Sequence, residues 1–241
     1  MAGTLLEVDG LTKRFGGFTA LHRVSLSVRA GERFGLIGPN GSGKTTLINC
    51  VSGALAADGG RILFKGRDIT TLAAHRRTRL GIVRSFQIPK PFTSMTVREN
   101  LGIPLEYAAH ARSQAGDADA EAAEILRTIG LEAKAHLRPA ELTQIEMRKL
   151  ELARAMAARP TLLISDEAMA GLSSVEVDDI LALLFRLNEQ GITIVMIEHI
   201  MRAVMRFSER VVVLDAGERI AEGTPAEIVR NPAVEKAYLG E

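Results

Sequence analysis

The sequence predicts an α/β protein with a mainly parallel sheet at its core, an antiparallel β subdomain near its N-terminus and a helical insertion subdomain. Three observations support this fold class. A glycine-rich loop at 38–45 stands between a short apolar run and a helical pattern. Continuous apolar runs at 161–165, 193–197 and 211–214 are typical of parallel strands that are covered on both faces. The segment at 96–159 is rich in Ala, Glu, Arg and Leu at helical spacing, which predicts an insertion built from helices.

The first part of the chain has a different pattern. Residues 5–13, 25–28 and 61–64 alternate in the manner of strands, and glycine turns rather than helices separate them. This spacing predicts an antiparallel sheet beside the core. A further strand is expected at 82–86.

Helices are predicted at 118–129 and 142–158 within the insertion, and at 175–188 between the first two of the three apolar runs. The expected organisation is a single domain, 1–241. Its parts are a core with the antiparallel sheet at 1–87 and 160–241, and a helical subdomain at 88–159.

Composition narrows the function classes. Hydrophobic residues are 46% of the chain, which is enough for a sizeable core, and the net charge of +1 gives no bias toward nucleic acid. Arg76, Arg77 and Arg79 lack interleaved aromatic residues, so we interpret them as a solvated face. The single cysteine, Cys50, is expected to be a small buried apolar residue.

The sequence also bears on a membrane role. The N-terminal residues lack the basic start and the long apolar stretch of a signal peptide. No apolar run approaches the ~20 residues that span a bilayer. Any membrane role is therefore expected to depend on a partner protein.

The glycine-rich loop has the complete pattern of a phosphate-binding loop. Its glycines allow backbone N–H groups to curl around the α- and β-phosphates, and the next helix directs its positive N-terminal end at them. Lys44 is expected to reach the β- and γ-phosphates, and Thr45 to offer its hydroxyl to Mg²⁺. The sequence thus predicts a nucleoside triphosphate site. Its assigned residues are Gly38, Pro39, Asn40, Gly41, Ser42, Gly43, Lys44, Thr45 and Thr46.

Two adjacent carboxylates follow the first of the three apolar runs. Asp166 and Glu167 are expected at the C-terminal end of a parallel strand, where sheets of this kind bind ligands. Asp166 is suited to hold Mg²⁺ through a water molecule, and Glu167 to orient or deprotonate an attacking water. His199 follows the next apolar run. Alone it would more often be structural, but in this order of motifs it is predicted to contact a γ-phosphate.

The order of these motifs resembles that of the ATP-binding subunits of ABC transporters, over essentially the whole chain. The resemblance implies a P-loop NTPase (RecA-like) core that hydrolyses ATP with Mg²⁺. It assigns Phe15 to stacking on adenine and Gln87 to contacts with Mg²⁺ and with the attacking water. Glu167 matches the catalytic glutamate and His199 the switch histidine. Residues 170–173 occupy the place of the D-loop, which touches a partner subunit.

Within this family, the chain looks most like the branched-chain amino acid uptake system. The resemblance implies the ATP-hydrolysing subunit of an importer on the cytoplasmic face of the membrane. The implied partners are a second ATP-binding subunit, transmembrane permease subunits and, indirectly, a solute-binding protein, with no nucleic acid. The stretches that carry this closer resemblance are 85–89, 95–101, 197–205 and 237–241.

The signature loop departs from the family pattern, which is usually Leu-Ser-Gly-Gly-Gln. Thr143 keeps a hydroxyl, but the two glycines that allow close backbone approach are missing. Glu146 brings a carboxylate near the place of a phosphate, and Ser173 replaces the usual aspartate of the D-loop. Because each signature in this family closes over the partner's nucleotide, we expect the two composite sites of a heterodimer to be unequal. The signature positions here are Leu142, Thr143, Gln144, Ile145 and Glu146.

Three other functions stay open. One is an ABC ATPase subunit for a different cargo, such as an exporter or a lipid-moving complex, because cargo selectivity lies in other subunits. Another is a soluble ABC ATPase that acts on ribosomes or DNA, although those usually carry two nucleotide units or a long coiled coil. The third is a catalytically silent regulatory subunit, which the altered signature favours. Lys44, Glu167 and His199 argue against the third.

Overall fold

The larger sheet of the molecule is mainly parallel, as the apolar runs predict. The structure, a computed structural model, describes residues 3–85, 89–112 and 117–239. Six strands pair in the order β10-β9-β3-β8-β7-β6, with β10 antiparallel to β9 and the other neighbours parallel. Their bounds are β3 (Arg33–Ile37), β6 (Ile82–Ser85), β7 (Leu162–Asp166), β8 (Thr193–Ile197), β9 (Arg210–Asp215) and β10 (Glu218–Gly223).

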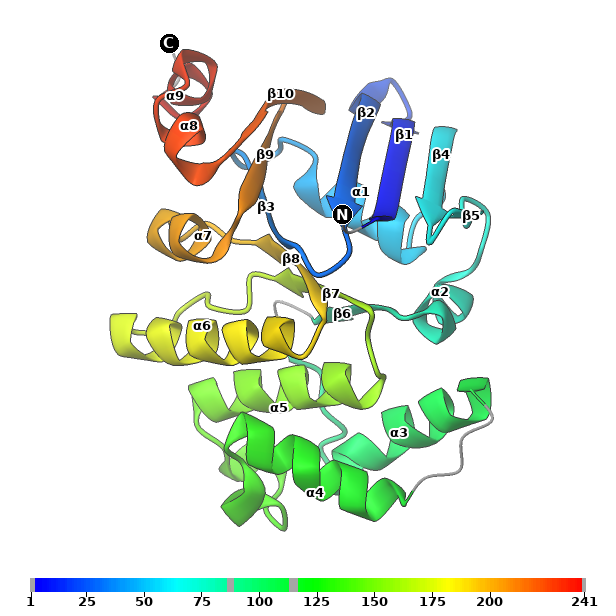
Figure 1. The fold of residues 1–241 in the computed structure, drawn as a ribbon, viewed down its shortest axis with the longest axis vertical. Helices are drawn as coiled ribbons and strands as arrows, with labels where there is room; N and C mark the ends of the chain where they lie inside the picture. Colours follow the sequence, from blue (N-terminus) through cyan, green and yellow to red (C-terminus); the bar gives the residue numbers. More distant parts are fainter. Residues whose placement is uncertain (1–2, 86–88, 113–116, 240–241) are drawn as a thin grey trace.

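Alternate side chains of this sheet enter two different cores. In β8, Ile194 and Met196 belong to a cluster with apolar residues of α5 (Gln144–Ala157) and of the two helices that follow it. Val195 and Ile197 pack instead with α1 (Lys44–Ser52) and with a second, four-stranded sheet. Burial on both faces explains why the strands are continuously apolar. Figure 1 shows the sheet between these layers. The helices next to it include α1 (Lys44–Ser52), α6 (Ser174–Glu189) and α7 (Met201–Phe207).

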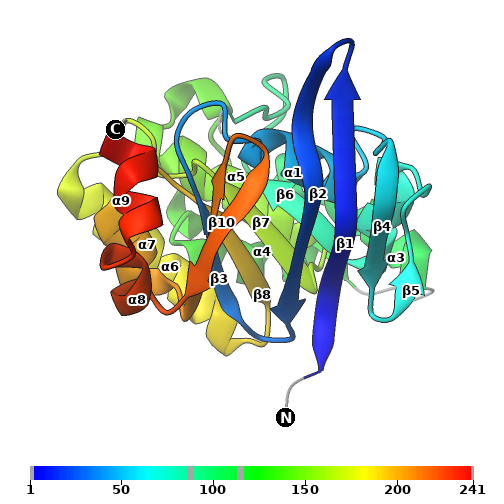
Figure 2. The same cartoon turned by 90° about the horizontal axis from the view of Figure 1, so that it is seen from above.

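A second sheet of four antiparallel strands covers α1, which confirms the predicted antiparallel β part. Its order is β2-β1-β4-β5, and Figure 2 shows the long β1–β2 hairpin beside β4. The strands are β1 (Thr4–Phe15), β2 (Phe18–Arg29), β4 (Gly59–Phe64) and β5 (Arg67–Asp68).

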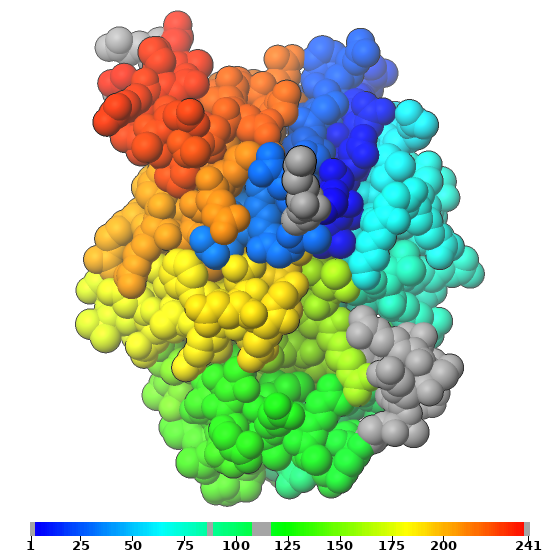
Figure 3. All heavy atoms as spheres, viewed as in Figure 1, coloured from blue at the N-terminus to red at the C-terminus, as the bar shows by residue number. Residues whose placement is uncertain are grey.

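Helices α3 (Glu99–Arg112), α4 (Ala118–Ile129) and α5 (Gln144–Ala157) form the helical layer seen in green at the bottom of Figures 1 and 3. The bounds of α4 are those predicted, because Asp117 caps its N-terminus and Gly130 ends it in a left-handed conformation. Helix α5 begins two residues later than predicted, because Thr143 is extended and caps it. Two short 3-10 turns, η1 (Glu132–Lys134) and η2 (Pro139–Glu141), precede α5.

The remaining helices are short. They are α2 (Ala74–Leu80), α8 (Pro225–Val229) and α9 (Pro232–Leu239). The sequence predicts none of them, because five to eight residues are too few for a helical period to stand out from chance. Figure 1 shows α8 and α9 beside β10, near the C-terminus.

The prediction that Arg77 belongs to a solvated face is wrong. Its side chain is only 2% exposed, whereas Arg76 and Arg79 are exposed as expected. The guanidinium is satisfied because it donates to four backbone carbonyls, those of Cys50, Val51, Thr70 and Leu72. A buried arginine with this many acceptors serves packing rather than solubility.

Cys50 is buried, as predicted. In the part of the chain that the structure describes, no helix is both long and apolar enough to cross a membrane.

Candidate nucleotide-binding and catalytic site

One cavity brings together most of the residues that the sequence assigns to nucleotide binding. Its volume is about 300 Å³, and it lies at the C-terminal ends of β3, β7 and β8. This is the edge at which parallel sheets bind ligands. The lining residues are Phe15, Phe18, Ala20, Asn40, Gly41, Ser42, Gly43, Lys44, Thr45, Thr46, Glu167 and His199.

The phosphate loop is wound around the ammonium group of Lys44. Its Nζ donates to the carbonyl oxygen of Gly38 at 2.7 Å and to that of Pro39 at 3.0 Å. Gly43 has a φ of +100°, and a Cβ at this position would lie 2.7 Å from the carbonyl oxygen of Ala20. The loop therefore requires glycine here, for its conformation and for its close approach to β2.

These residues fit a bound phosphate group. Lys44 is 6% exposed, and the atoms that it contacts in the loop are uncharged. Burial lowers the pKa of Lys44, while the nearby charges of Glu167 and Asp166 oppose that change. A buried ammonium group at the start of α1 is a favourable place for an anion.

Phe15 and Phe18 form an aromatic edge at the mouth of the cavity. They face each other in the β1–β2 register and are 49% and 64% exposed. Nζ of Lys13 lies 5.5 Å from the centre of the Phe15 ring. Exposed rings at this position fit the predicted stacking of an adenine base.

The predicted metal ligand Asp166 is held by Arg84, a residue of β6 that the sequence motifs do not single out. Nε and Nη2 of Arg84 donate to Oδ2 of Asp166 at 3.2 and 2.5 Å. Nη1 donates to Oδ1 of Asn49 on α1 at 2.6 Å. Arg84 thus joins three elements around the site. Its signal in the sequence is a charge directly after two apolar residues of a predicted strand.

Thr45 and Asp166 lie on elements that meet at this cavity, as a shared metal requires. Within the described residues, no group of three or more His, Cys, Asp or Glu side chains forms a metal site. A magnesium ion bound here would therefore take further ligands from water and from phosphate, which is its usual preference.

Glu167 and His199 form a pair at the cavity. Nε2 of His199 lies 2.7 Å from Oε1 of Glu167. An ionised carboxylate only accepts, so Nε2 carries the proton. Glu167 has a φ of +48°, and its N–H donates to the carbonyl oxygen of Ile197 at 2.9 Å. A left-handed conformation in a residue other than glycine is strained, and such strain concentrates at functional sites.

Glu198 is a second residue that sequence reasoning misses. It is 2% exposed, and its Oε1 accepts a hydrogen bond from the N–H of Met169 at 2.9 Å. Burial raises the pKa of Glu198 to about 7, although the N–H groups of Met169 and His199 act in the opposite direction. The signal in the sequence is a carboxylate directly after an apolar strand.

This shift predicts a dependence of stability on pH. The folded protein binds the Glu198 proton more tightly than the unfolded chain, so the stabilisation is complete below about pH 4.5 and is lost as the pH rises through 7. Glu198→Gln cannot ionise and should be more stable than the wild type at pH 8, by up to roughly 3 kcal/mol, with little difference near pH 4.5. Thermal unfolding at several pH values measures this. A constant difference between the two proteins would contradict it.

The signature residues form the N-terminal cap of α5. Oγ1 of Thr143 accepts from the N–H of Glu146 at 3.4 Å, and Oε2 of Glu146 accepts from the N–H of Thr143 at 3.0 Å. Glu146 is also paired with Lys134 at 2.6 Å, and these contacts lower the pKa of Glu146, Lys134 most of all. The carboxylate is thus turned back onto its own helix, where it takes up an N–H group that an anion would use.

Three other positions that the sequence analysis singles out, or that lie beside the site, are Gln87, Ser173 and Ser165. Gln87 lies outside the described residues, so its contacts with Mg²⁺ and water stay a prediction. Ser173 caps α6 through the N–H of Glu176. Ser165 has a buried hydroxyl without a partner among the described residues, and nothing in the structure explains it.

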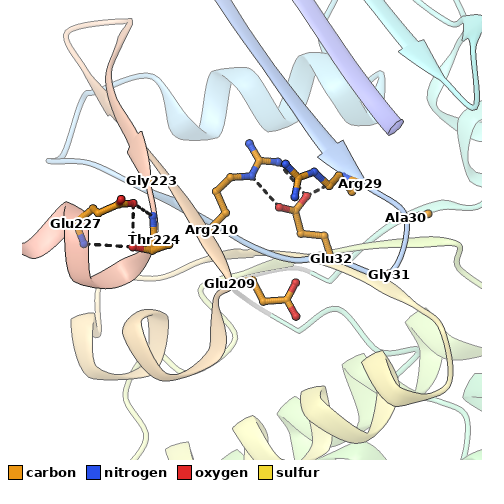
Figure 4. Close-up of a pocket in the computed structure, with 9 residues that line it drawn as sticks. All are labelled: Arg29, Ala30, Gly31, Glu32, Glu209, Arg210, Gly223, Thr224 and Glu227. Atoms are coloured by element: carbon orange, nitrogen blue, oxygen red, sulfur yellow. Dashed lines mark hydrogen bonds and ion pairs between the residues drawn. The ribbon is translucent and has the colours of Figure 1, made fainter. Parts of the chain in front are cut away.

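A larger cavity of about 810 Å³ lies at the opposite ends of the strands, near the starts of β3, β9 and α8. Figure 4 shows that Glu32 contacts Arg210 and Arg29, and that Glu227 contacts Thr224. Arg210 donates to Glu32 at 2.8 Å, and Glu227 accepts from the N–H of Thr224 at 2.7 Å. The Arg210–Glu32 pair joins the start of β9 to the turn before β3, and the phosphate loop lies at the other end of β3.

The fold and the site together define a P-loop ATPase. The glycine loop, the strand-end carboxylates and the layered parallel sheet are the features of that class. More narrowly, the chain belongs to the ABC transporter family, whose domain matches residues 21–170. Residues 218–241 match a domain described as "Branched-chain amino acid ATP-binding cassette transporter".

Relatives of known name support the same family over the full length. The chain is 40% identical to the high-affinity branched-chain amino acid transport ATP-binding protein BraF of Pseudomonas aeruginosa, and 39% identical to LivG of Escherichia coli K12. Each comparison covers 100% of both chains.

Solved structures agree. A nucleotide-free ATP-binding cassette from an ABC transporter is 34% identical, with a TM-score of 0.89 over 99% of this chain and 100% of that one. A dimeric cassette bound to ADP and Pi is 27% identical, with a TM-score of 0.81 over 92% of this chain and 99% of that one. The predicted fold class, family and ATPase activity are confirmed.

Proposed function

We propose that this protein is the ATP-hydrolysing subunit of an importer for branched-chain or related amino acids, acting through a separate membrane permease. The single observation that carries its mechanism is the cavity in which the Glu167–His199 pair and the Lys44 loop line one space. The cargo is inferred from the names of the full-length relatives and from the C-terminal domain match.

Nucleotide binding is divided between two parts of the cavity. Lys44 binds the β- and γ-phosphates and the loop N–H groups bind the α- and β-phosphates, because both present positive charge at the start of α1. Phe15 stacks on adenine at the open edge. Thr45, Asp166 and Gln87 would hold Mg²⁺, which would neutralise charge on the phosphates. Arg84 fixes the orientation of Asp166.

Hydrolysis is assigned to Glu167. Its carboxylate orients or deprotonates the attacking water, and the Nε2 proton of His199 holds that carboxylate in place. In the nucleotide-bound state the same Nε2–H is shared between Glu167 and the γ-phosphate, the contact that the motif order predicts. The rest of the rate enhancement comes from positioning and charge neutralisation.

The proposed partner is a second ATP-binding subunit, whose signature closes over this phosphate loop. The family's dimeric cassette structure supports such a pair. Closure moves permease subunits that receive cargo from a solute-binding protein, so the proposed location is the cytoplasmic face of the membrane.

Reconstitution tests the function. The chain, a second ATP-binding subunit and the permease subunits are placed in vesicles with a solute-binding protein. We expect ATP-dependent uptake of radiolabelled leucine, and no uptake with Lys44→Ala. Hydrolysis without leucine uptake would support the ATPase activity and would contradict the proposed cargo. Absence of hydrolysis in the assembled complex would favour a silent regulatory subunit.

The altered signature predicts two unequal composite sites. Residues 144 and 145 are the first two of α5, where side chains restrict close backbone approach to a phosphate. Replacing both Gln144 and Ile145 with glycine should raise turnover chiefly in the partner's site. Trapping of labelled ADP, with one phosphate-loop lysine removed at a time, separates the sites. No change in either site would reject the hypothesis.

A further inference from the structure

The loop that follows Glu167 is held from two sides. On one side, Glu198 accepts a hydrogen bond from the N–H of Met169 at 2.9 Å. On the other side, Nη2 of Arg148 donates to the carbonyl oxygen of Ala170 at 3.1 Å. Both contacts are made to the backbone of the loop. The position of the loop therefore depends on side chains from outside it.

The same loop touches the first residue of α5. Gly171 has a φ of +78°, and a Cβ on it would lie 2.8 Å from Nε2 of Gln144. Gln144 is a signature position, and Arg148 lies one helical turn further along α5. The start of the signature helix therefore approaches this loop at two positions one helical turn apart.

The path from Glu198 to the proposed catalytic carboxylate is short. Met169 is two residues after Glu167. On the other side, the N–H of Glu167 donates to the carbonyl oxygen of Ile197, the residue before Glu198. Consecutive residues at the end of β8 thus hold the chain at Glu167 and again at Met169. The left-handed backbone of Glu167 needs such support, because a residue other than glycine does not favour it.

Burying the carboxyl group of Glu198 at this position costs free energy. Glu198 lies near the carboxylates of Glu167 and Asp166, and both raise the pKa of Glu198. Arg148 interacts with Glu198 electrostatically. An apolar side chain would avoid the cost of burial but would leave the N–H of Met169 without its acceptor.

We propose that Glu198 is a positioning residue for Glu167. By holding the N–H of Met169, it keeps the loop, and hence the Glu167 carboxylate, in place against His199. Arg148 holds the same loop from α5, so that the signature helix and the water-activating carboxylate of one chain move together. This inference rests on the proposed catalytic role of Glu167.

Two substitutions of Glu198 separate positioning from packing. Glu198→Gln keeps an acceptor for Met169, whereas Glu198→Ala removes it. In the alanine variant of the full chain, we expect backbone amide exchange across 168–171 to accelerate by about tenfold, as loss of one buried hydrogen bond allows. In the assembled complex, kcat should fall by at least ~10-fold with the KM for ATP changed less than ~3-fold. Glu198→Gln should stay within ~3-fold of the wild type in both measurements.

Two further variants test a buried carboxylate far from the site and the second contact to the loop. Glu32→Gln is the matched control, because Glu32 is also a buried carboxylate but pairs with Arg210 at the opposite ends of the strands. It should lower Tm without changing kcat. Arg148→Met should act in the same direction as Glu198→Ala. The double variant should then lose less than the two separate losses combined, because both act on one loop.

The outcomes distinguish this inference from the proposed function. Unchanged amide exchange and normal kcat in Glu198→Ala, with Glu167→Gln inactive, would overturn the positioning role alone. An equal loss in the alanine and glutamine variants, with a raised KM, would indicate general disruption and also overturn it. A normal rate in Glu167→Gln would instead reject the proposed catalytic role. If Glu198→Ala does not fold, the other two variants test the positioning role: a normal kcat in Arg148→Met, or a large loss in Glu198→Gln, would overturn it.

Discussion

Glu167→Gln is expected to slow ATP hydrolysis by at least ~10²-fold, the usual contribution of a positioned general base, while ATP binding stays largely intact. The amide keeps the size of the side chain but cannot take a proton from water. The parts that bind phosphate are on the loop around Lys44 and do not depend on the Glu167 charge for their hydrogen bonds. Phosphate release in a single turnover measures the chemical step, and titration with a fluorescent ATP analogue measures binding.

The control for this substitution is Glu176→Gln. Glu176 is a partly exposed carboxylate that caps α6 together with Ser173, and it does not line the nucleotide cavity. Its loss should reduce stability slightly and leave hydrolysis within about twofold, as expected for a surface cap. Normal hydrolysis by Glu167→Gln would show that Glu167 does not activate the attacking water.

Arg84→Met is expected to destabilise the protein by about 3–5 kcal/mol, because it leaves Asp166 as a charge without its ion-pair partner. The side chains of this pair are only 13% and 8% exposed. In a chain of this size such a loss lowers Tm by roughly 6–20 °C. Thermal unfolding without metal or nucleotide measures the loss. The deficit should shrink when Mg²⁺ and a non-hydrolysable ATP analogue are added, since the metal restores positive charge beside Asp166.

Arg61→Met is the matched control, because Arg61 forms a solvent-exposed pair with Asp9. Its effect should stay below ~1 kcal/mol. If both arginine variants melt at the wild-type temperature in the absence of metal, the Arg84–Asp166 pair does not stabilise the free protein. The binding role of Asp166 would then need a separate test.

The parts of the site that sequence alone predicts are local ones. The phosphate loop, the two carboxylates and His199 each stand at the end of an apolar run, so their neighbours in the chain reveal their place in the sheet. Helix α4 is predicted to its last residue for the same reason, because Asp117 and Gly130 flank it directly.

The residues that sequence reasoning misses act over long separations. Arg84 and Asp166 are 82 residues apart in the chain, and Glu198 and Met169 are 29 apart. No spacing rule connects such positions, and a charge directly after apolar strand residues shows only that some partner must exist. Glu146 is a further example. Its charge is visible in the sequence, but the orientation of its carboxylate is set by Lys134 and by the cap of α5.

Arg77 neutralises the end of α1 that points away from the phosphates. Its guanidinium donates to the carbonyls of Cys50 and Val51, which carry the partial negative charge of the helix dipole. Because Arg77 compensates the partial negative charge at the C-terminal end of α1, that charge reduces the positive potential at Lys44 less. A buried arginine at the far end of a nine-residue helix therefore strengthens the attraction for an anion that it never touches.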